Sequence, residues 1–434
     1  MDLSEDPGMR AIPMVGATLV LSLAASAAEP PTAEQLAALD AAVRGYVERD
    51  ETVSAELLVL VGGKELLHAT YGFADREAKR PLERDQIHCI RSMTKTLVGT
   101  AAQILIDEGT VGLDDPAGKW LPAFADERHA AITVRHLLEH TSGLGLSVLV
   151  GHDVRTIRSL DEIVTLAAAE ELVSTPGSEF HYSDNGADVL AAIVAKAAGR
   201  PADAFIRERI LDPLGMSATS GQTPAERARC VSGYVGAKGA WMRFWSPEDP
   251  PVFQCFLGSQ SAWSTVSDYA KLLALWQHDG MVGERRLLSH AAIERGLTLA
   301  HRTSVVERGV IEGYGQLWSV ENEGDGASAR RVAFGHGGSD GTVGWCFPER
   351  DLLVLFFTQS RGGTSILSFE QTLGQVLFGR EPPRRDAAEL EGWWWAEGED
   401  HPGRIVRRDG TPTLEIPGRF ALTMKPLEGV DRWG

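Results

Sequence analysis

Cysteine is scarce in this chain, and basic residues are outnumbered by acidic ones. The four cysteines are widely spaced, form no CxxC pair and join no Cys/His cluster of metal-ligand spacing: Cys89, Cys230, Cys255 and Cys346. We therefore expect buried free thiols rather than disulfides, and no bound metal. The 42 basic residues against 60 acidic ones give a net charge of -18. That balance argues against a nucleic-acid partner and against general binding to anionic membranes.

Long apolar runs and nucleotide-binding loops are also missing. No Gly-rich phosphate loop or dinucleotide fingerprint occurs, so we expect no cofactor. Beyond the N-terminus, no stretch is long and apolar enough to span a bilayer. Residues 11–28 are apolar and end in small residues, with Ala25-Ser26-Ala27 as a cleavage site. They predict a signal peptide over residues 1–28 and an exported, periplasmic protein. An N-terminal anchor and a docked apolar helix are the alternatives.

Periodic patterns place strands toward both ends of the chain and helices between them. A helical pattern covers 33–49, and strand-like runs follow at 57–61 and 65–71, separated by Gly62-Gly63. Further helices are expected at 133–140 (capped by Thr133), 187–198, 267–278 and 369–378, and further strands at 314–320, 331–334, 342–347 and 352–358. This order predicts an α/β fold of the α+β type. An antiparallel sheet is built from N- and C-terminal segments and flanked by helices, with an inserted mainly helical domain.

The same patterns give the domain boundaries. We expect an α/β sheet domain over 29–110 and 260–380, and a mainly helical domain with an aromatic loop over 111–259. Residues 384–434 are expected to form a C-terminal appendage, and the sequence contains no internal repeat.

Ser92-Met93-Thr94-Lys95 is the most informative motif. Apolar residues continue behind it at helical spacing up to Gly109, so Ser92 should start a helix with Lys95 on the same face. Free N–H groups at that start stabilise an oxyanion, and the helix dipole favours a neutral Lys95. A neutral amine beside a hydroxyl is a base beside a nucleophile, which indicates acyl transfer through a serine ester. Alone, a Ser-x-x-Lys match is more often a solvated helix face.

Two further segments give that motif its context. His181-Tyr182-Ser183-Asp184-Asn185 precedes the helix at 187–198, and Phe334-Gly335-His336-Gly337-Gly338-Ser339 lies at a strand edge before a hairpin. With three motifs in this order, the chain resembles the serine hydrolase superfamily of class C β-lactamases, DD-peptidases and family VIII carboxylesterases. The resemblance implies a covalent acyl-serine mechanism without metal or cofactor.

The resemblance also implies roles for individual residues. Ser92 would attack the carbonyl carbon. Either Lys95 or Tyr182 would be the general base that takes the Ser92 proton, and the choice between them is left open. Backbone N–H groups of Ser92 and Ser339 would form the oxyanion hole. The alternative for Tyr182 is a core aromatic residue with a satisfied hydroxyl.

The chain departs from the superfamily pattern in two motifs. Asp184 stands where β-lactamases usually have Asn, and either Asp184 or the neighbouring Asn185 is expected to face the substrate. His336 stands where β-lactamases usually have Lys, and a neutral imidazole anchors a carboxylate more weakly. Gly337 and Gly338 should let the substrate approach the strand closely. These departures favour neutral ester substrates, with a packed strand histidine as the alternative for His336.

An aromatic segment and a second serine motif complete the candidates. Trp241 and Trp263 belong to an aromatic-rich segment and are expected to wall the substrate pocket, with ordinary lid packing as an equal alternative. Gly337-Gly338-Ser339-Asp340-Gly341 matches the G-x-S-x-G elbow of α/β-hydrolases. A strand-like segment follows it, whereas an elbow needs a helix, so we interpret it as a chance match.

The expected function is a carboxylesterase acting on small neutral esters. The first alternative is a β-lactamase or D-amino peptide hydrolase acting on cell-wall material, which export would place near its substrate. Two further alternatives are an acyltransferase and a penicillin-recognising module that acylates at Ser92 without turnover. The sequence predicts no nucleic-acid partner and no stable membrane span in the mature protein, and it leaves the oligomeric state open.

Overall fold

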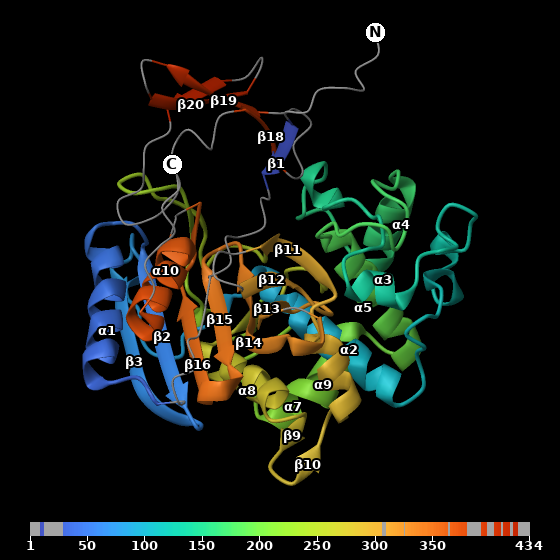
Figure 1. Ribbon diagram of the computed structural model, residues 1–434, viewed down its shortest axis with the longest axis horizontal. Coiled ribbons are helices and arrows are strands. Elements are labelled where there is room, and N and C mark those ends of the chain that lie inside the picture. The colour runs from blue at the N-terminus through green and yellow to red at the C-terminus, as the bar shows by residue number, and fades with distance from the viewer. Residues whose placement is uncertain are drawn as a thin grey trace.

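The computed structural model describes residues 9–12, 29–305, 310–324, 326–362, 365–379, 392–396, 403–408, 411–416 and 420–423. Within these residues, the largest element is a nine-stranded antiparallel sheet in the order β11-β12-β13-β14-β15-β16-β2-β3-β4. Its strands are β2 (Ser54–Val61), β3 (Lys64–Asp75), β4 (Arg80–Pro81), β11 (His301–Val305), β12 (Val310–Tyr314), β13 (Ser319–Glu323), β14 (Arg330–Gly338), β15 (Thr342–Phe347) and β16 (Leu352–Phe357). Figure 1 shows the blue N-terminal strand β2 beside the orange C-terminal strand β16. The predicted sheet built from both ends of the chain is confirmed.

Helices cover both faces of this sheet. On one face lie α1 (Ala33–Glu48) and α10 (Ser365–Phe378), and on the other lies α8 (Val266–Gln277) (Figure 1). Leu39 and Val43 of α1 pack in the first layer, where the rings of Phe356 and Phe369 stack with centroids 4.5 Å apart. Strand β16 is buried at every position because both of its faces are covered. The Thr32 side chain caps α1 in a capping box.

A buried helix, α2 (Thr94–Asp107), passes between the sheet and the remaining helices. Side chains from Thr94 to Leu105 are buried, so the helix has no solvated face over that length. Its C-terminal turn ends at Gly109, which has a positive φ of 71°, as the sequence predicted. The other helices are α3 (Val134–Leu138), α4 (Leu160–Ala169), α5 (Asp184–Ala198), α6 (Ala202–Ile206), α7 (Asp212–Leu214) and α9 (His290–Leu297).

Small sheets of short strands join the remaining segments. Strand β5 (His88–Cys89) pairs with β8 (Trp263–Ser264), and β9 (Met281–Val282) pairs with β10 (Arg285–Arg286). A three-stranded sheet contains β6 (Gly233–Val235) between β7 (Met242–Trp245) and β17 (Ser360–Arg361). The pairing of β5 with β8 lies directly before Ser92 in the chain, so it anchors the segment that presents this serine.

The predicted strand at 314–320 is wrong. Tyr314 ends β12 and Ser319 begins β13, and the residues between them form the turn that joins these two strands. Leu317 has a positive φ of 62°, and its N–H donates to the Leu138 carbonyl at 2.9 Å. Contacts with other elements therefore override an apolar, strand-like pattern at this turn.

The ends of the chain bear on two expectations. Most of the predicted signal peptide over 1–28 lies outside the described residues, apart from β1 (Met9–Ile12). This strand pairs with β18 (Gly392–Ala396) in a five-stranded sheet completed by β19 (Gly403–Arg408), β20 (Thr411–Ile416) and β21 (Phe420–Thr423). None of the helices in the described part of the chain combines the length and hydrophobicity that crossing a membrane requires.

All four cysteines are free, as expected, and three are buried.

Candidate active site

Ser92 lies in a 3₁₀ turn, Arg91–Met93, that leads directly into α2. The first N–H groups of such a turn have no acceptor within the helix, which leaves them available to an anion. Lys95 follows one turn later with its side chain fully buried, whereas Ser92 is half-buried. The spacing that the sequence suggested therefore brings a reachable hydroxyl and a buried amine onto one helical face.

The Lys95 amine donates to a carboxylate and to a backbone carbonyl. Its Nζ donates to Asp184 Oδ1 at 2.6 Å and to the Ser259 carbonyl at 3.0 Å. Burial lowers the pKa of Lys95, but the Asp184 carboxylate and the Tyr182 phenol together outweigh burial and raise that pKa above its ordinary value. Lys95 is therefore a charged ammonium, and the expectation of a neutral amine is wrong. The helix dipole is a weaker influence than a carboxylate in direct contact.

Ser259 reaches Lys95 through a closely packed loop. A Cβ on Gly258 would lie 2.6 Å from Ala191 Cβ, so only glycine lets this loop approach α5. The Asp188 carboxylate then accepts hydrogen bonds from the Ser259 N–H at 2.8 Å and the Ser259 hydroxyl at 3.0 Å. Burial raises the pKa of Asp188 to about 7. The Asp188 carboxyl thus fixes the carbonyl that holds the Lys95 amine.

Tyr182 completes the group around Ser92. The Lys95 Nζ lies 4.7 Å from the centre of the Tyr182 ring. Burial raises the pKa of the Tyr182 phenol, while the charge of Lys95 and hydrogen bonds with Lys95 and Ser92 lower it. The net direction is upward, so the activation expected from Lys95 is present but smaller than the effect of burial. The structure brings Ser92, Lys95 and Tyr182 together, as the motif spacing predicted.

The first turn of α5 separates the two neighbouring polar side chains of the second motif. Asp184 faces Lys95, whereas the Asn185 amide donates to Glu170 Oε2 at 3.0 Å and accepts from the Val148 N–H at 2.8 Å. Successive residues of a helix point about 100° apart, which explains the different directions. Asp184 is therefore the member of the pair that lies in the site, and Asn185 ties α5 to the loop at Val148.

His336 lies on β14, buried to 2% exposure. Its Nδ1 lies 2.7 Å from the Gly337 carbonyl oxygen, which can only accept, so Nδ1 carries the hydrogen and Nε2 a lone pair. Nε2 is buried and has no hydrogen-bond partner among the described residues. Burial, together with the charge of Lys95, lowers the pKa of His336 to about 3. The imidazole is neutral at ordinary pH.

An aromatic cluster surrounds Tyr182, and sequence reasoning missed most of it. The His140 ring lies 4.6 Å from the Tyr182 ring, and the Tyr314 and His336 rings lie 5.8 Å and 6.4 Å away. His140 accepts the Ser183 N–H on Nδ1 at 3.1 Å, which orients its ring against Tyr182. The signal was available in the expected helix at 133–140, which ends at this histidine, but its long-range contacts are invisible to periodicity.

The glycines of the third motif have different surroundings. A Cβ on Gly337 would meet only Thr342 O, at 3.7 Å, so this position is open as expected. A Cβ on Gly338 would lie 2.3 Å from the Ile90 carbonyl oxygen. Gly338 therefore admits the backbone that leads to Ser92, and the expectation that it makes room for substrate is corrected. Ser339 follows this contact and is exposed.

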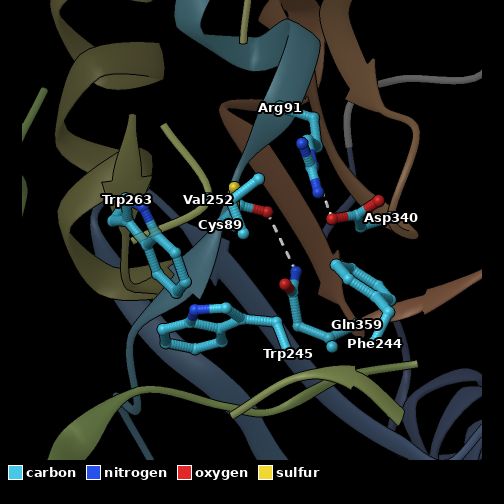
Figure 2. A pocket seen from close by; sticks show the side chains of 9 residues that line it. Cys89, Arg91, Phe244, Trp245, Val252, Trp263, Asp340 and Gln359 are labelled. Carbon is cyan, nitrogen blue, oxygen red and sulfur yellow. Dashed lines mark hydrogen bonds and ion pairs between the residues drawn. The ribbon is translucent and has the colours of Figure 1, made fainter. Parts of the chain in front are cut away.

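The two tryptophans proposed as pocket walls take other positions. The Trp241 indole N–H donates to the Asp50 carbonyl at 3.0 Å, which holds it instead against the end of α1. Trp263 is buried, with its ring centre 4.9 Å from that of Trp245. Figure 2 shows both rings lining a small hollow beside Cys89 and Gln359. For Trp263 the packing alternative fits better, because the hollow lies along the segment before Ser92.

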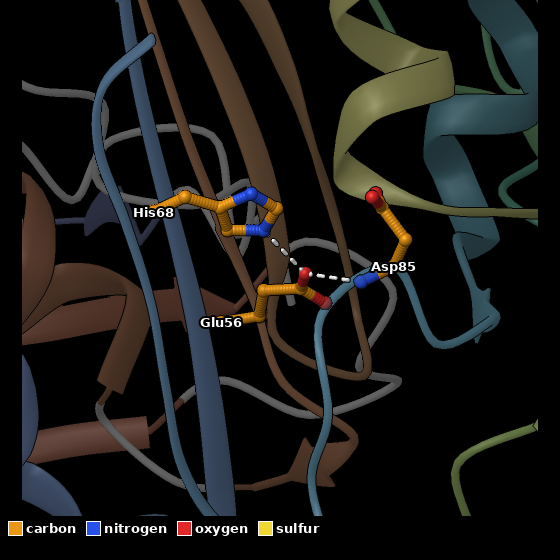
Figure 3. Close-up of side chains that lie close together, drawn as sticks. All are labelled: Glu56, His68 and Asp85. Atoms are coloured by element: carbon orange, nitrogen blue, oxygen red, sulfur yellow. Dashed lines mark hydrogen bonds and ion pairs between the residues drawn. The ribbon is translucent and has the colours of Figure 1, made fainter.

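A second polar cluster combines two residues of β2 and β3 with one from the segment between β4 and β5. Glu56, His68 and Asp85 each offer a ligand atom within 4.8 Å of the others. Glu56 Oε1 is already engaged, because His68 Nε2 lies 2.7 Å away and the Asp85 N–H donates to it at 2.7 Å. In Figure 3 the Asp85 carboxylate points away from this pair, and it accepts the Ser267 N–H at 3.4 Å. We interpret the cluster as a tie between the β2–β3 pair and the segment that leads to Ser92.

The comparisons with known proteins agree with this geometry. A family model described as Beta-lactamase matches residues 39–371, which is well over half of the chain. The chain belongs to the beta-lactamase family. It is accordingly a serine hydrolase of the β-lactamase/transpeptidase superfamily, as the three motifs suggested.

Relatives in this family carry several descriptions. Esterase EstB of Burkholderia gladioli is 36% identical over 197 residues, which are 42% of this chain and 50% of EstB. The chain thus matches half the length of that relative. Protein Rv1367c of Mycobacterium tuberculosis is 30% identical over 331 residues, 66% of this chain and 81% of that protein.

Solved structures show the same fold. EstCE1, described as a hydrolase with promiscuous acyltransferase activity, superposes with a TM-score of 0.67 at 22% identity, covering 79% of this chain and 99% of EstCE1. The octameric penicillin-binding protein homologue from Pyrococcus abyssi gives a TM-score of 0.65 at 22% identity, covering 89% of each chain. At this identity the likeness establishes the architecture and leaves the substrate to the residues of the site.

Proposed function

We propose that the protein is a carboxylesterase that cleaves small neutral esters through an acyl-serine at Ser92. The observation that carries this substrate class is His336, which is buried and neutral and has an unpartnered lone pair on Nε2 within the described residues. A lone pair repels a carboxylate, so β-lactams and peptide C-termini lack the cationic anchor that a lysine supplies. An uncharged ester needs no such anchor. The esterase description of EstB supports the same conclusion.

In the proposed reaction, Tyr182 acts in its deprotonated form: Ser92 Oγ attacks the ester carbonyl carbon while the Tyr182 phenolate takes the hydroxyl proton. Lys95 keeps its own proton because of Asp184, so it stabilises the phenolate of Tyr182 rather than acting as the base. The carbonyl oxygen becomes negative and accepts hydrogen bonds from the Ser92 and Ser339 N–H groups. The bond to the alkoxy oxygen then breaks, and Tyr182 returns the proton to the departing alcohol. Water repeats these steps on the acyl-serine and releases the acid.

A paired rate assay tests this proposal. The purified protein is given p-nitrophenyl butyrate and nitrocefin, with Ser92→Ala as the control. We expect fast ester cleavage and slow nitrocefin turnover, both lost in the variant. Efficient nitrocefin turnover would instead show that the site anchors a carboxylate, and would move the protein to the β-lactamase or cell-wall peptidase alternative. A burst of product without steady turnover would indicate a recognition module.

Export is a separate part of the proposal, supported by the apolar residues 11–28 and the small residues that follow them. Removal of residues 1–28 would also remove β1 from its pairing with β18. Cell fractionation of the full chain, with N-terminal sequencing of the product, tests this point. An uncleaved protein in the cytoplasmic fraction would contradict it.

A further inference from the structure

Arg91, the residue before Ser92, combines a strained backbone with a buried charge. Its φ is +47°, in the left-handed region that residues with a side chain rarely adopt. The residue is 4% exposed, and its guanidinium lies 5.9 Å from the Phe244 ring centre and 5.1 Å from that of Phe253. Such a conformation persists only where the surroundings hold it in place. The side-chain contacts of Arg91 therefore help to fix the backbone from which Ser92 projects.

The partner that holds Arg91 lies on the other side of the site. Arg91 Nε donates to Asp340 Oδ2 at 2.5 Å, as Figure 2 shows, and the Asp340 side chain is fully buried. The second oxygen of Asp340 accepts from Arg361 Nε at 2.6 Å, and its backbone carbonyl accepts the Ser360 N–H at 2.7 Å. Asp340 directly follows Ser339. The ion pair thus joins the chain segment before Ser92 to the segment that carries Ser339.

The two segments also touch through their backbones. The Ile90 carbonyl fills the space that a Cβ of Gly338 would occupy, and the Thr342 hydroxyl donates to the same carbonyl at 3.4 Å. The 90–92 and 338–340 segments therefore run in direct contact, with one buried ion pair across them. A shift in that pair changes the separation of the two segments, because its ends lie one residue from Ser92 and one from Ser339.

We propose that the Arg91–Asp340 ion pair sets the spacing of the two N–H groups that form the oxyanion hole, which makes Arg91 and Asp340 positioning residues. This inference rests on the proposed function. An oxyanion hole acts on the transition state, and its donors must lie about 2.7–3.1 Å from the oxygen that becomes negative, which leaves a tolerance of only a few tenths of an ångström. Loosening the pair should therefore lower kcat and leave substrate binding nearly unchanged.

The test compares variants that differ in how they loosen the pair. Arg91→Gln removes the charge but leaves Asp340 paired with Arg361, so the fold keeps its buried carboxylate satisfied. Arg91→Lys keeps a charge and is the second variant if Arg91→Gln does not fold. The matched control is Arg243→Gln, because Arg243 pairs at 2.8 Å with Asp75, a buried carboxylate elsewhere in the molecule.

The readouts are kcat and KM for p-nitrophenyl butyrate and the inhibition constant of butylboronic acid. A boronic acid forms a tetrahedral adduct with a serine hydroxyl, and one oxygen of that adduct occupies the oxyanion hole. We expect Arg91→Gln to lower kcat by about ten- to a hundredfold, less than the loss of a whole donor. KM should stay within about twofold, and boronate affinity should fall in proportion to kcat/KM. Arg91→Lys should fall between the parent and Arg91→Gln, and Arg243→Gln should match the parent.

Two results overturn the inference. One is an Arg91 variant with a lower melting temperature but unchanged kcat and boronate affinity, which would make the ion pair purely structural. The other is equal loss in Arg243→Gln. Failure of the proposed function has a different signature, because the parent protein itself would then show no ester cleavage that depends on Ser92.

Discussion

Asp184→Asn isolates the electrostatic feature that most distinguishes this site. The 2.6 Å contact with Lys95 corresponds to about 6 kcal/mol of Coulomb energy at an effective dielectric constant of about 20. This figure is an upper limit, since the Asp184 side chain is 19% exposed and asparagine still offers Lys95 an acceptor. Allowing for both, we expect the pKa of Lys95 to fall by about one to two units, or about 1.4 to 2.7 kcal/mol. The pKa of Tyr182 should fall as well, because the charge of Asp184 raises it.

The assay is the pH dependence of kcat/KM for p-nitrophenyl butyrate, which reports the ionisation of the free enzyme. A base with a lower pKa is deprotonated at lower pH, so the acid limb of the profile should move to lower pH by about one unit. Asp161→Asn is the matched control, because the exposed side chains of Asp161 and Lys196 pair at 3.1 Å away from the site. An acid limb that stays in place, or moves to higher pH, would refute the claim that Asp184 controls the protons of this site.

Other residues give three further predictions. In the folded protein the pKa of His336 is about 3, whereas in the unfolded chain a histidine takes up a proton near pH 6.5. Protons therefore favour the unfolded state, and the contribution of His336 to stability is lost as the pH falls below about 6.5. In thermal unfolding, His336→Gln should therefore flatten the rise of Tm between pH 4 and 6.5; an unchanged slope would contradict the neutral imidazole. Gly338→Ala should lower kcat by at least about tenfold because its Cβ meets the Ile90 carbonyl, whereas Gly337→Ala should cost less than about threefold; equal rates would contradict the packing. Trp241→Ala should leave the relative rates on acetate, butyrate and octanoate esters unchanged, and a changed preference would return Trp241 to the substrate pocket.

Local patterns predicted most of the fold. The helix at 33–49, the hairpin at Gly62-Gly63 and the helix capped by Thr133 all follow from spacing and capping, which depend on neighbours in sequence. The strand expected at 314–320 was wrong because the turn there is stabilised by carbonyl groups of distant segments, including that of Leu138. Periodicity carries no information about such contacts.

In the candidate site, too, local patterns could be predicted from the sequence and long-range contacts could not. Motif order was enough to bring Ser92, Lys95 and Tyr182 together, since each motif sits at the start of an element. The charge state of Lys95 could not be predicted, because it depends on Asp184 arriving from another helix. The Arg91–Asp340 pair spans 249 positions of sequence, and only the folded chain reveals it.

The most direct test of the acyl-serine mechanism is the site of covalent labelling. The protein is treated with a p-nitrophenyl alkylphosphonate, which leaves a stable adduct on an activated serine, and the modified peptide is identified by mass spectrometry. We predict one adduct per chain on Ser92, absent from Ser92→Ala and retained in Ser339→Ala. An adduct on Ser339 would contradict this account, because it would mean that the G-x-S-x-G segment holds the nucleophile.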